Sequence, residues 1–100
     1  MIIQSDLSVI SGVIQTNSPT AELEFENCVI DANLISTTFT FRQYNRIQSP
    51  INATTVSIYD VANLKFSNSL KTVNLYIDSS DVVFNSTAIA QNVEIRVTIL

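Results

Sequence analysis

Apolar and polar residues alternate along most of this chain. The alternation is clearest in five segments, residues 23–26, 39–42, 56–59, 73–76 and 93–96. A period of two places one face of a strand against a core and the other in solvent, and the residues that dominate here (Val, Ile, Phe, Tyr and Thr) favour strands. No segment sustains a helical period. The pattern therefore predicts an all-β protein.

The apolar anchors themselves return about every 17 residues. A first series consists of Val9, Phe25, Phe41, Ile58, Leu75 and Ile95. A second consists of Ile14, Ile30, Ile47, Leu64 and Val82, and a third of Ile35, Ile51, Leu70 and Ile89. Series that share one period are typical of a chain that adds a similar coil at each turn. We therefore predict a single-domain parallel β-solenoid over residues 1–100, with about five short coils of roughly 16–20 residues.

The period divides the chain into five coils, each with three short sides, and a final strand. The coils run over 7–20, 21–38, 39–55, 56–72 and 73–92, and the strand over 93–100.

Outward positions one period apart should be cross-strand neighbours in such a stack. Glu26 and Arg42 then form a pair of opposite charge. Tyr59 and Tyr76 form an aromatic pair, and Arg96 follows in the same column, where its guanidinium can lie over the ring of Tyr76.

An antiparallel β-sandwich is the alternative fold, because seven or eight short alternating strands would also suit it. Such a fold commonly uses Asn-Gly or Asp-Gly hairpin turns, and this sequence contains neither. The solenoid is therefore the preferred prediction.

Charged residues make up only 14% of the chain, and the net charge is −4. So few charges indicate a chain that buries much of its surface or joins an assembly. The five basic residues are scattered singly, at Arg42, Arg46, Lys65, Lys71 and Arg96. Binding to nucleic acid needs clustered Lys and Arg, so no nucleic-acid partner is expected.

Neither the N-terminus nor any apolar stretch predicts a targeting or membrane segment. The first six residues lack the basic and apolar regions of a signal peptide, and no uncharged apolar run approaches the roughly 18–20 residues that span a bilayer. The single cysteine, Cys28, has no internal disulfide partner and is predicted to be a small buried hydrophobe.

No residue set in the sequence predicts catalysis, a cofactor or a metal site. The chain has no histidine, so a serine nucleophile would lack its usual base. Oxygen atoms at the bend Asp78-Ser79-Ser80-Asp81 are of the kind that binds calcium, but Asp and Ser more often cap such a turn. Glu22, Glu24 and Glu26 alternate along one strand, where they are expected to serve solubility.

With these residues in view, the chain resembles parallel β-helix proteins, especially the short, narrow β-helices of viral fibres and spikes. The resemblance is one of pattern and extends from Leu7 to Arg96. A six-residue rhythm over 23–47 is similar to that of left-handed β-helix acyltransferases, but it ends after Ile47, and the histidine base of those enzymes is missing. Pentapeptide-repeat and ice-binding solenoids fit less well, since neither of their rhythms is sustained.

This resemblance implies a non-enzymatic structural protein, namely a virion fibre, spike or decoration module that acts as a stiff oligomeric rod. A homo-oligomer, with a homotrimer as one form, or other virion proteins are then the expected partners. The expected location is the virion, with the cytoplasm before assembly or the cell surface as alternatives. The alternative function is a carbohydrate-binding or adhesion module, which would use the face formed by Tyr59, Tyr76 and Arg96.

Overall fold

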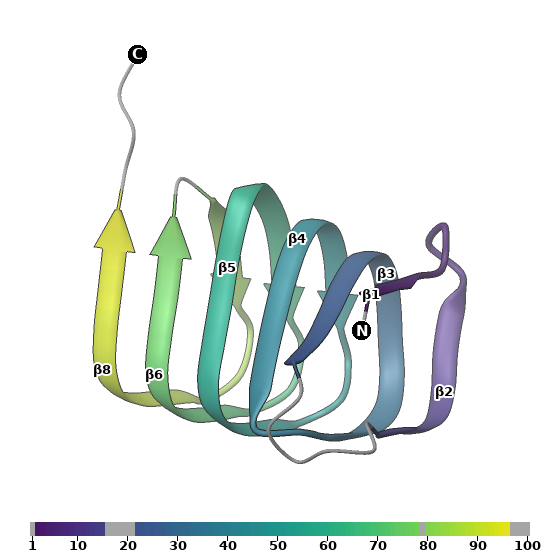
Figure 1. The fold of residues 1–100 in the computed structure, drawn as a ribbon, viewed down its shortest axis with the longest axis horizontal. Coiled ribbons are helices and arrows are strands. Elements are labelled where there is room, and N and C mark those ends of the chain that lie inside the picture. The colour runs from purple at the N-terminus through teal and green to yellow at the C-terminus, as the bar shows by residue number, and fades with distance from the viewer. Residues whose placement is uncertain (1, 16–21, 79, 97–100) are drawn as a thin grey trace.

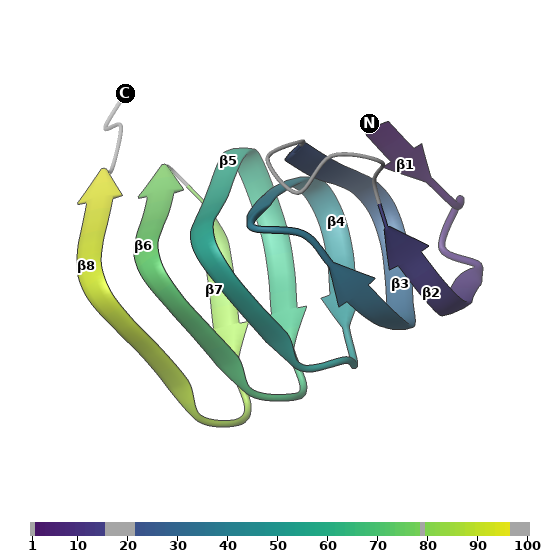
Figure 2. The same cartoon turned by 60° about the horizontal axis from the view of Figure 1, so that its bottom comes forward.

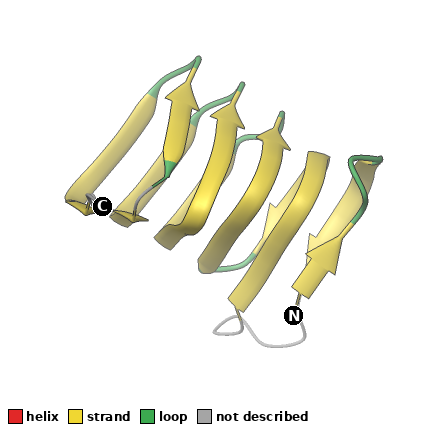
Figure 3. Ribbon diagram, turned by 90° about the horizontal axis from the view of Figure 1, so that it is seen from above, coloured by secondary structure: helices red, strands yellow, loops and turns green. Residues whose placement is uncertain are grey.

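The chain forms a parallel β-solenoid. The computed structural model describes residues 2–15, 22–78 and 80–96, and these contain strands and no helix (Figure 3). The strands are β1 (Ile2–Gln4), β2 (Val9–Gln15), β3 (Glu22–Ile35), β4 (Thr38–Ile47), β5 (Ile51–Phe66), β6 (Leu70–Asp78), β7 (Asp81–Phe84) and β8 (Ala88–Arg96). Every pairing between them is parallel. The predicted fold class is therefore confirmed.

The coils follow one another along the longest axis of the molecule (Figure 1). Strands β1, β3, β4, β5, β6 and β8 are neighbours in that order, while β2 pairs with β3 and β7 pairs with β5. The long strands β3, β4 and β5 each pass from a front side to a back side of the coil. The predicted end of the first coil at 20, the start of the next at 21, and positions 97–100 of the final strand lie outside the described residues.

A residue with left-handed backbone turns each of these long strands from front to back. The three residues are Asn27 (φ 54°), Gln43 (φ 61°) and Asp60 (φ 67°). The pairing register shifts at these corners as in a β-bulge, with extra residues in β4 beside Gln43 and in β5 beside Asp60. The amide of Asn27 donates a hydrogen bond to Gln43 Oε1 at 2.8 Å, which joins two successive corners. A β-bulge lets the strand turn without ending the ladder.

A second bend divides the front of the later coils. The pairing of β6 with β8 covers 70–72 and 74–78 and omits Val73, and both strands bend part-way along their length (Figure 2). In the preceding coil, the carbonyl of Thr37 accepts from the amides of Thr54 and Thr55 at 2.9 and 3.1 Å. With β7 as the third segment, the coil has three short sides, which agrees with the predicted shape.

Inward side chains from all sides form one hydrophobic core, in which phenylalanines run from coil to coil. Ring centroids are 5.6 Å apart for Phe25 and Phe41, 5.8 Å for Phe41 and Phe66, and 5.2 Å for Phe66 and Phe84. Phe39 packs beside the first two rings. The phenylalanine rings thus fill the core, and aromatic packing of this kind stabilises the stack beyond simple burial.

Buried polar side chains supply hydrogen bonds where the corners interrupt the ladder. Asn45 is fully buried; its Oδ1 accepts from the amide of Cys28 at 3.0 Å, and its Nδ2 donates to the carbonyls of Phe25 and Arg42 at 3.3 and 2.8 Å. Ser49 Oγ accepts from the amide of Ala32 at 2.7 Å. The Asn and Ser residues of the turns thus bond to backbone of the preceding coil as well as to their own turn, because buried backbone groups need partners.

The register corrects the three predicted anchor series. Ile58 lies opposite Ile77 and not Leu75, and Ile47 lies opposite Phe66 and not Leu64. Both errors are shifts of two residues, which keep a side chain on the same face of a strand. For these residues the prediction of which side chains point inward was therefore correct, but their partners on the neighbouring strand were wrong.

Further predicted pairings are wrong in the last coil and in the first coil. Leu70 lies opposite Ala88, and Ile89 lies instead opposite Lys71, on the outer face. In the first coil, the residue opposite Phe25 is Ile3 and not Val9, and the residue opposite Ile30 is Ile10 and not Ile14. The predictions failed here because they placed the anchors close to a period of about 17 residues, whereas corners of different length separate the coils.

Candidate functional site

Tyr59, Tyr76 and Arg96 lie on the outer face of the front side, as predicted, but not in one column. Arg42 lies opposite Tyr59, and Ser57 lies opposite Tyr76. Arg96 lies opposite Asp78. The predicted column is therefore wrong by two residues between β5 and β6, and the two tyrosines are diagonal neighbours.

The arginine that contacts a tyrosine ring in this region is Arg42, not Arg96. The guanidinium carbon of Arg42 lies 4.9 Å from the ring centroid of Tyr59. Arg96 Nε instead donates to Glu94 Oε1 at 2.8 Å, in a pair whose side chains are both exposed. The predicted stacking of Arg96 over Tyr76 is thus replaced by an ion pair along β8.

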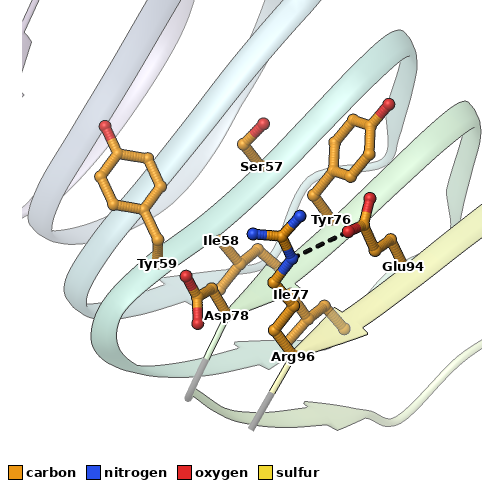
Figure 4. A pocket seen from close by; sticks show the side chains of 8 residues that line it. All are labelled: Ser57, Ile58, Tyr59, Tyr76, Ile77, Asp78, Glu94 and Arg96. Atoms are coloured by element: carbon orange, nitrogen blue, oxygen red, sulfur yellow. Dashed lines mark hydrogen bonds and ion pairs between the residues drawn. The ribbon is translucent and has the colours of Figure 1, made fainter. Parts of the chain in front are cut away.

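The same three predicted residues nevertheless surround one pocket. Its volume is about 270 Å³. The residues that line it are Ser57, Ile58, Tyr59, Tyr76, Ile77, Asp78, Glu94 and Arg96. The rings of Tyr59 and Tyr76 lie on either side of Ser57, and the guanidinium of Arg96 lies between Asp78 and Glu94 (Figure 4). The two-residue shift keeps both tyrosines on one face, which explains why they meet at the pocket.

A network of charged side chains adjoins the pocket on the side of Tyr59. Arg42 forms ion pairs with Glu24 at 2.9 Å, with Glu26 at 3.6 Å, and with Asp60. The predicted pairing of Glu26 with Arg42 is confirmed by the register. Hydrogen bonds to Glu24 and Asp60 raise the pKa of the Arg42 guanidinium, so it stays charged. Burial, and then the charge of Glu24, raise the pKa of the Tyr59 hydroxyl, so it stays protonated at neutral pH.

The last coil exposes a second candidate surface, the terminal face, which we define by Val93 and Ile95. These side chains continue inward columns, since they lie opposite Leu75 and Ile77. Leu75 and Ile77 are 5% and 9% exposed, whereas Val93 and Ile95 are 56% and 63% exposed. One further coil of strands would cover the surface that Val93 and Ile95 expose and that Leu75 and Ile77 do not.

The other candidate residues have structural partners. At the bend that includes Asp78, Ser80 Oγ accepts from the amide of Ala62 at 3.0 Å and donates to the carbonyl of Asp78 at 2.8 Å; Ser79 lies outside the described residues. Cys28 is buried, as predicted, and burial raises the pKa of its thiol. Within residues 2–15, 22–78 and 80–96, no three His, Cys, Asp or Glu side chains form a group that could hold a metal ion.

Three polar residues of the pocket were not predicted to share a face with the two tyrosines and Arg96: Ser57, Asp78 and Glu94. A signal for them exists, because each lies two residues along a strand from a predicted site residue and therefore on the same face.

Comparison with known proteins gives no match: no family model, no curated protein and no solved structure is significantly similar to this chain. The described part of the chain also contains no helix of the length and apolarity that crossing a membrane requires.

Proposed function

We propose that this chain is a non-enzymatic structural module that contributes a stiff segment of β-solenoid to a larger assembly. The observation that carries the proposal is the exposed terminal face formed by Val93 and Ile95. Its side chains belong to core columns, yet in this chain alone more than half of each is in contact with solvent. A protein that presents core positions at the end of a stack is suited to association there.

Energetic arguments favour covering this face. Burying a Val or Ile side chain fully is worth about 1.5–3 kcal/mol relative to leaving it exposed. Strand β8 also ends the order of paired strands among the described residues. A strand edge of this kind offers backbone groups for a further parallel strand. Apolar burial and backbone pairing would therefore stabilise the same contact.

The stiffness of the module follows from how successive coils are joined. The phenylalanine column crosses the coils from Phe25 to Phe84, and Asn45 and Ser80 hydrogen-bond across the corners. Bending the stack would separate rings and break buried hydrogen bonds, which are costly to leave unmade.

The assembly that we propose is a homo-oligomer in a virion fibre, spike or decoration protein, with a homotrimer around a three-fold axis as one form. The resemblance to short viral β-helices and the low content of charged residues support this setting. The coil that covers the terminal face then comes from a second copy of the chain.

The first test is the solution mass by light scattering over a range of protein concentrations, before and after mild heating in detergent. The proposal expects a mass of at least twice, and for a trimer three times, the 11.1 kDa of one chain. The variant Ile95→Lys should return the protein to a monomer. The matched control is Ile89→Lys on the same strand, because Ile89 is 54% exposed but lies on the outer face.

Two results would contradict the proposal. One is a wild-type monomer at every concentration, which would show that the terminal face does not pair with a second copy. The other is an oligomer that Ile95→Lys leaves intact while Ile89→Lys dissociates it, which would place the contact on the outer face of the coil.

A further inference from the structure

Core packing does not explain the ring of Tyr76. The side chain is 42% exposed, and within the part of the chain that the structure describes no ring stacks on it and no group hydrogen-bonds its hydroxyl. It also lies diagonally from Tyr59 rather than opposite it, so the two do not form a ladder of stacked rings that would hold the coils in register. An exposed ring beside a pocket is typical of a recognition surface.

The neighbouring ring of Tyr59 is fixed in position. Arg42 belongs to β4 and contacts the Tyr59 ring, whereas the pocket lies toward β6. Arg42 is itself bonded to Glu24 and Asp60. A side chain supported in this way loses little conformational freedom when a ligand binds, and that preserves affinity. The pocket therefore has one supported aromatic wall and one adaptable aromatic wall.

Polar groups complete the pocket with both donors and acceptors. Ser57 contributes a hydroxyl, Asp78 and Glu94 contribute carboxylates, and Arg96 contributes guanidinium N–H donors. Diagonal neighbours on adjacent strands are about 7–8 Å apart, so one ligand can touch both tyrosines and these polar groups together. A saccharide matches this combination, because its ring has apolar C–H faces for aromatic contact and hydroxyls around its rim for hydrogen bonds.

Charge and size narrow the ligand class. Two carboxylates and one guanidinium line the pocket, and Glu24, Glu26 and Asp60 lie beyond Tyr59 with Arg42. The excess of carboxylates disfavours an anionic sugar. The volume of about 270 Å³ is just below the roughly 300–1,000 Å³ of sites for drug-sized ligands and fits one or two sugar rings.

We propose that the pocket between Tyr59 and Tyr76 binds a neutral saccharide. The C–H face of one sugar ring packs against Tyr76, and its hydroxyls bond to Ser57, Asp78, Glu94 and Arg96. The pocket uses outward side chains of β8, Glu94 and Arg96, whereas the terminal face uses the inward side chains of Val93 and Ile95, so the proposal goes beyond the structural role proposed above. Loss of oligomers in the Ile95→Lys variant would not by itself remove saccharide binding.

The test probes a glycan array that carries neutral hexose oligomers, N-acetylhexosamine oligomers and anionic oligosaccharides. The wild-type protein is expected to bind neutral glycans, and Tyr76→Ala to weaken that binding by roughly tenfold or more. Tyr44→Ala is the matched control, because Tyr44 is a tyrosine of similar exposure (38%) that lies outside the pocket and has Arg46 over its ring. Circular dichroism checks that both variants keep the β-solenoid.

Four results would overturn the proposal: no binding anywhere on the array, a preference for anionic glycans, equal binding by Tyr76→Ala and wild type, or equal losses in Tyr76→Ala and Tyr44→Ala. Should Tyr76→Ala fail to fold, Arg96→Gln supplies the second variant, because the side chain of Arg96 is 73% exposed and forms an ion pair with Glu94 on its own strand. It should weaken neutral-glycan binding, and unchanged binding would count against the pocket. Light scattering on the same samples separates this outcome from failure of the oligomer.

Discussion

Replacement of Asn45 by alanine tests the account of the corners directly. Asn45 is fully buried and makes three hydrogen bonds, all to backbone groups: it accepts from the amide of Cys28 and donates to the carbonyls of Phe25 and Arg42. Alanine would leave all three groups without this partner. The side chain is not at a surface, so water cannot replace it without opening the corner.

The magnitude follows from these contacts. Each buried polar group that loses its partner costs about 1–3 kcal/mol. We place the amide in the middle of this range. Each carbonyl keeps a second lone pair, so we place it at the low end. Together the three groups give a loss of about 4 kcal/mol in the free energy of unfolding. For a domain of this size, that loss corresponds to a fall in Tm of roughly 20 °C. It is also a large part of the total stability of about 5–15 kcal/mol that small domains have.

The assay is urea and thermal unfolding followed by far-ultraviolet circular dichroism, with all proteins at one concentration. Asn33→Ala is the matched control, because Asn33 is an exposed asparagine on the same back side of the stack, and its replacement should change stability by less than about 0.5 kcal/mol. A loss for Asn45→Ala below about 1 kcal/mol, or one no larger than that of Asn33→Ala, would refute the argument that the corners depend on this side chain.

Three further predictions address the core, a tyrosine and the thiol. Phe41→Ala should lower the free energy of unfolding, measured in urea, by about 3–5 kcal/mol. Phe84→Ala should lower it clearly less, because Phe41 is fully buried between rings whereas Phe84 is only partly buried near the end of the stack. Equal losses would contradict the described core. Subtracting the spectrophotometric titration of Tyr59→Phe from that of the wild type should give a Tyr59 component with a midpoint above pH 10.0, since burial raises this pKa. Because the pKa of Tyr59 is higher in the folded state, the protonated Tyr59 contributes to stability below pH 10.0, and this contribution is lost as the pH rises through the folded-state pKa. A midpoint at or below 10.0 would show the ring to be solvated. Cys28 should react with a thiol reagent such as iodoacetamide only after unfolding, because its thiol is buried and burial raises its pKa; rapid labelling of the folded protein would place the thiol at the surface.

The sequence by itself determined the fold class and, in the central coils, the inward and outward faces. A period of two specifies which side of a strand is buried whatever the strand pairs with, and so Phe25, Phe41 and Ile58 were correctly placed in the core. The steps from Phe25 to Phe41 and from Phe41 to Ile58, 16 and then 17 residues, were also right, because the corner at Gln43 is only one residue longer than the corner at Asn27. The same step of 16 residues led to the correct pairing of Glu26 with Arg42.

Only the tertiary structure decided the register of the later coils and the composition of the site. Ile58 to Ile77 is a step of 19 residues and not 17, and no local signal announces it, because the corner at Asp60 has left-handed backbone without a glycine. An added pair of residues leaves the alternation unchanged, so Tyr59 and Tyr76 kept their face while their partners changed. The pocket, the contact of Arg42 with Tyr59, and the hydrogen bonds of Asn45 all depend on that register, because each joins residues on different coils.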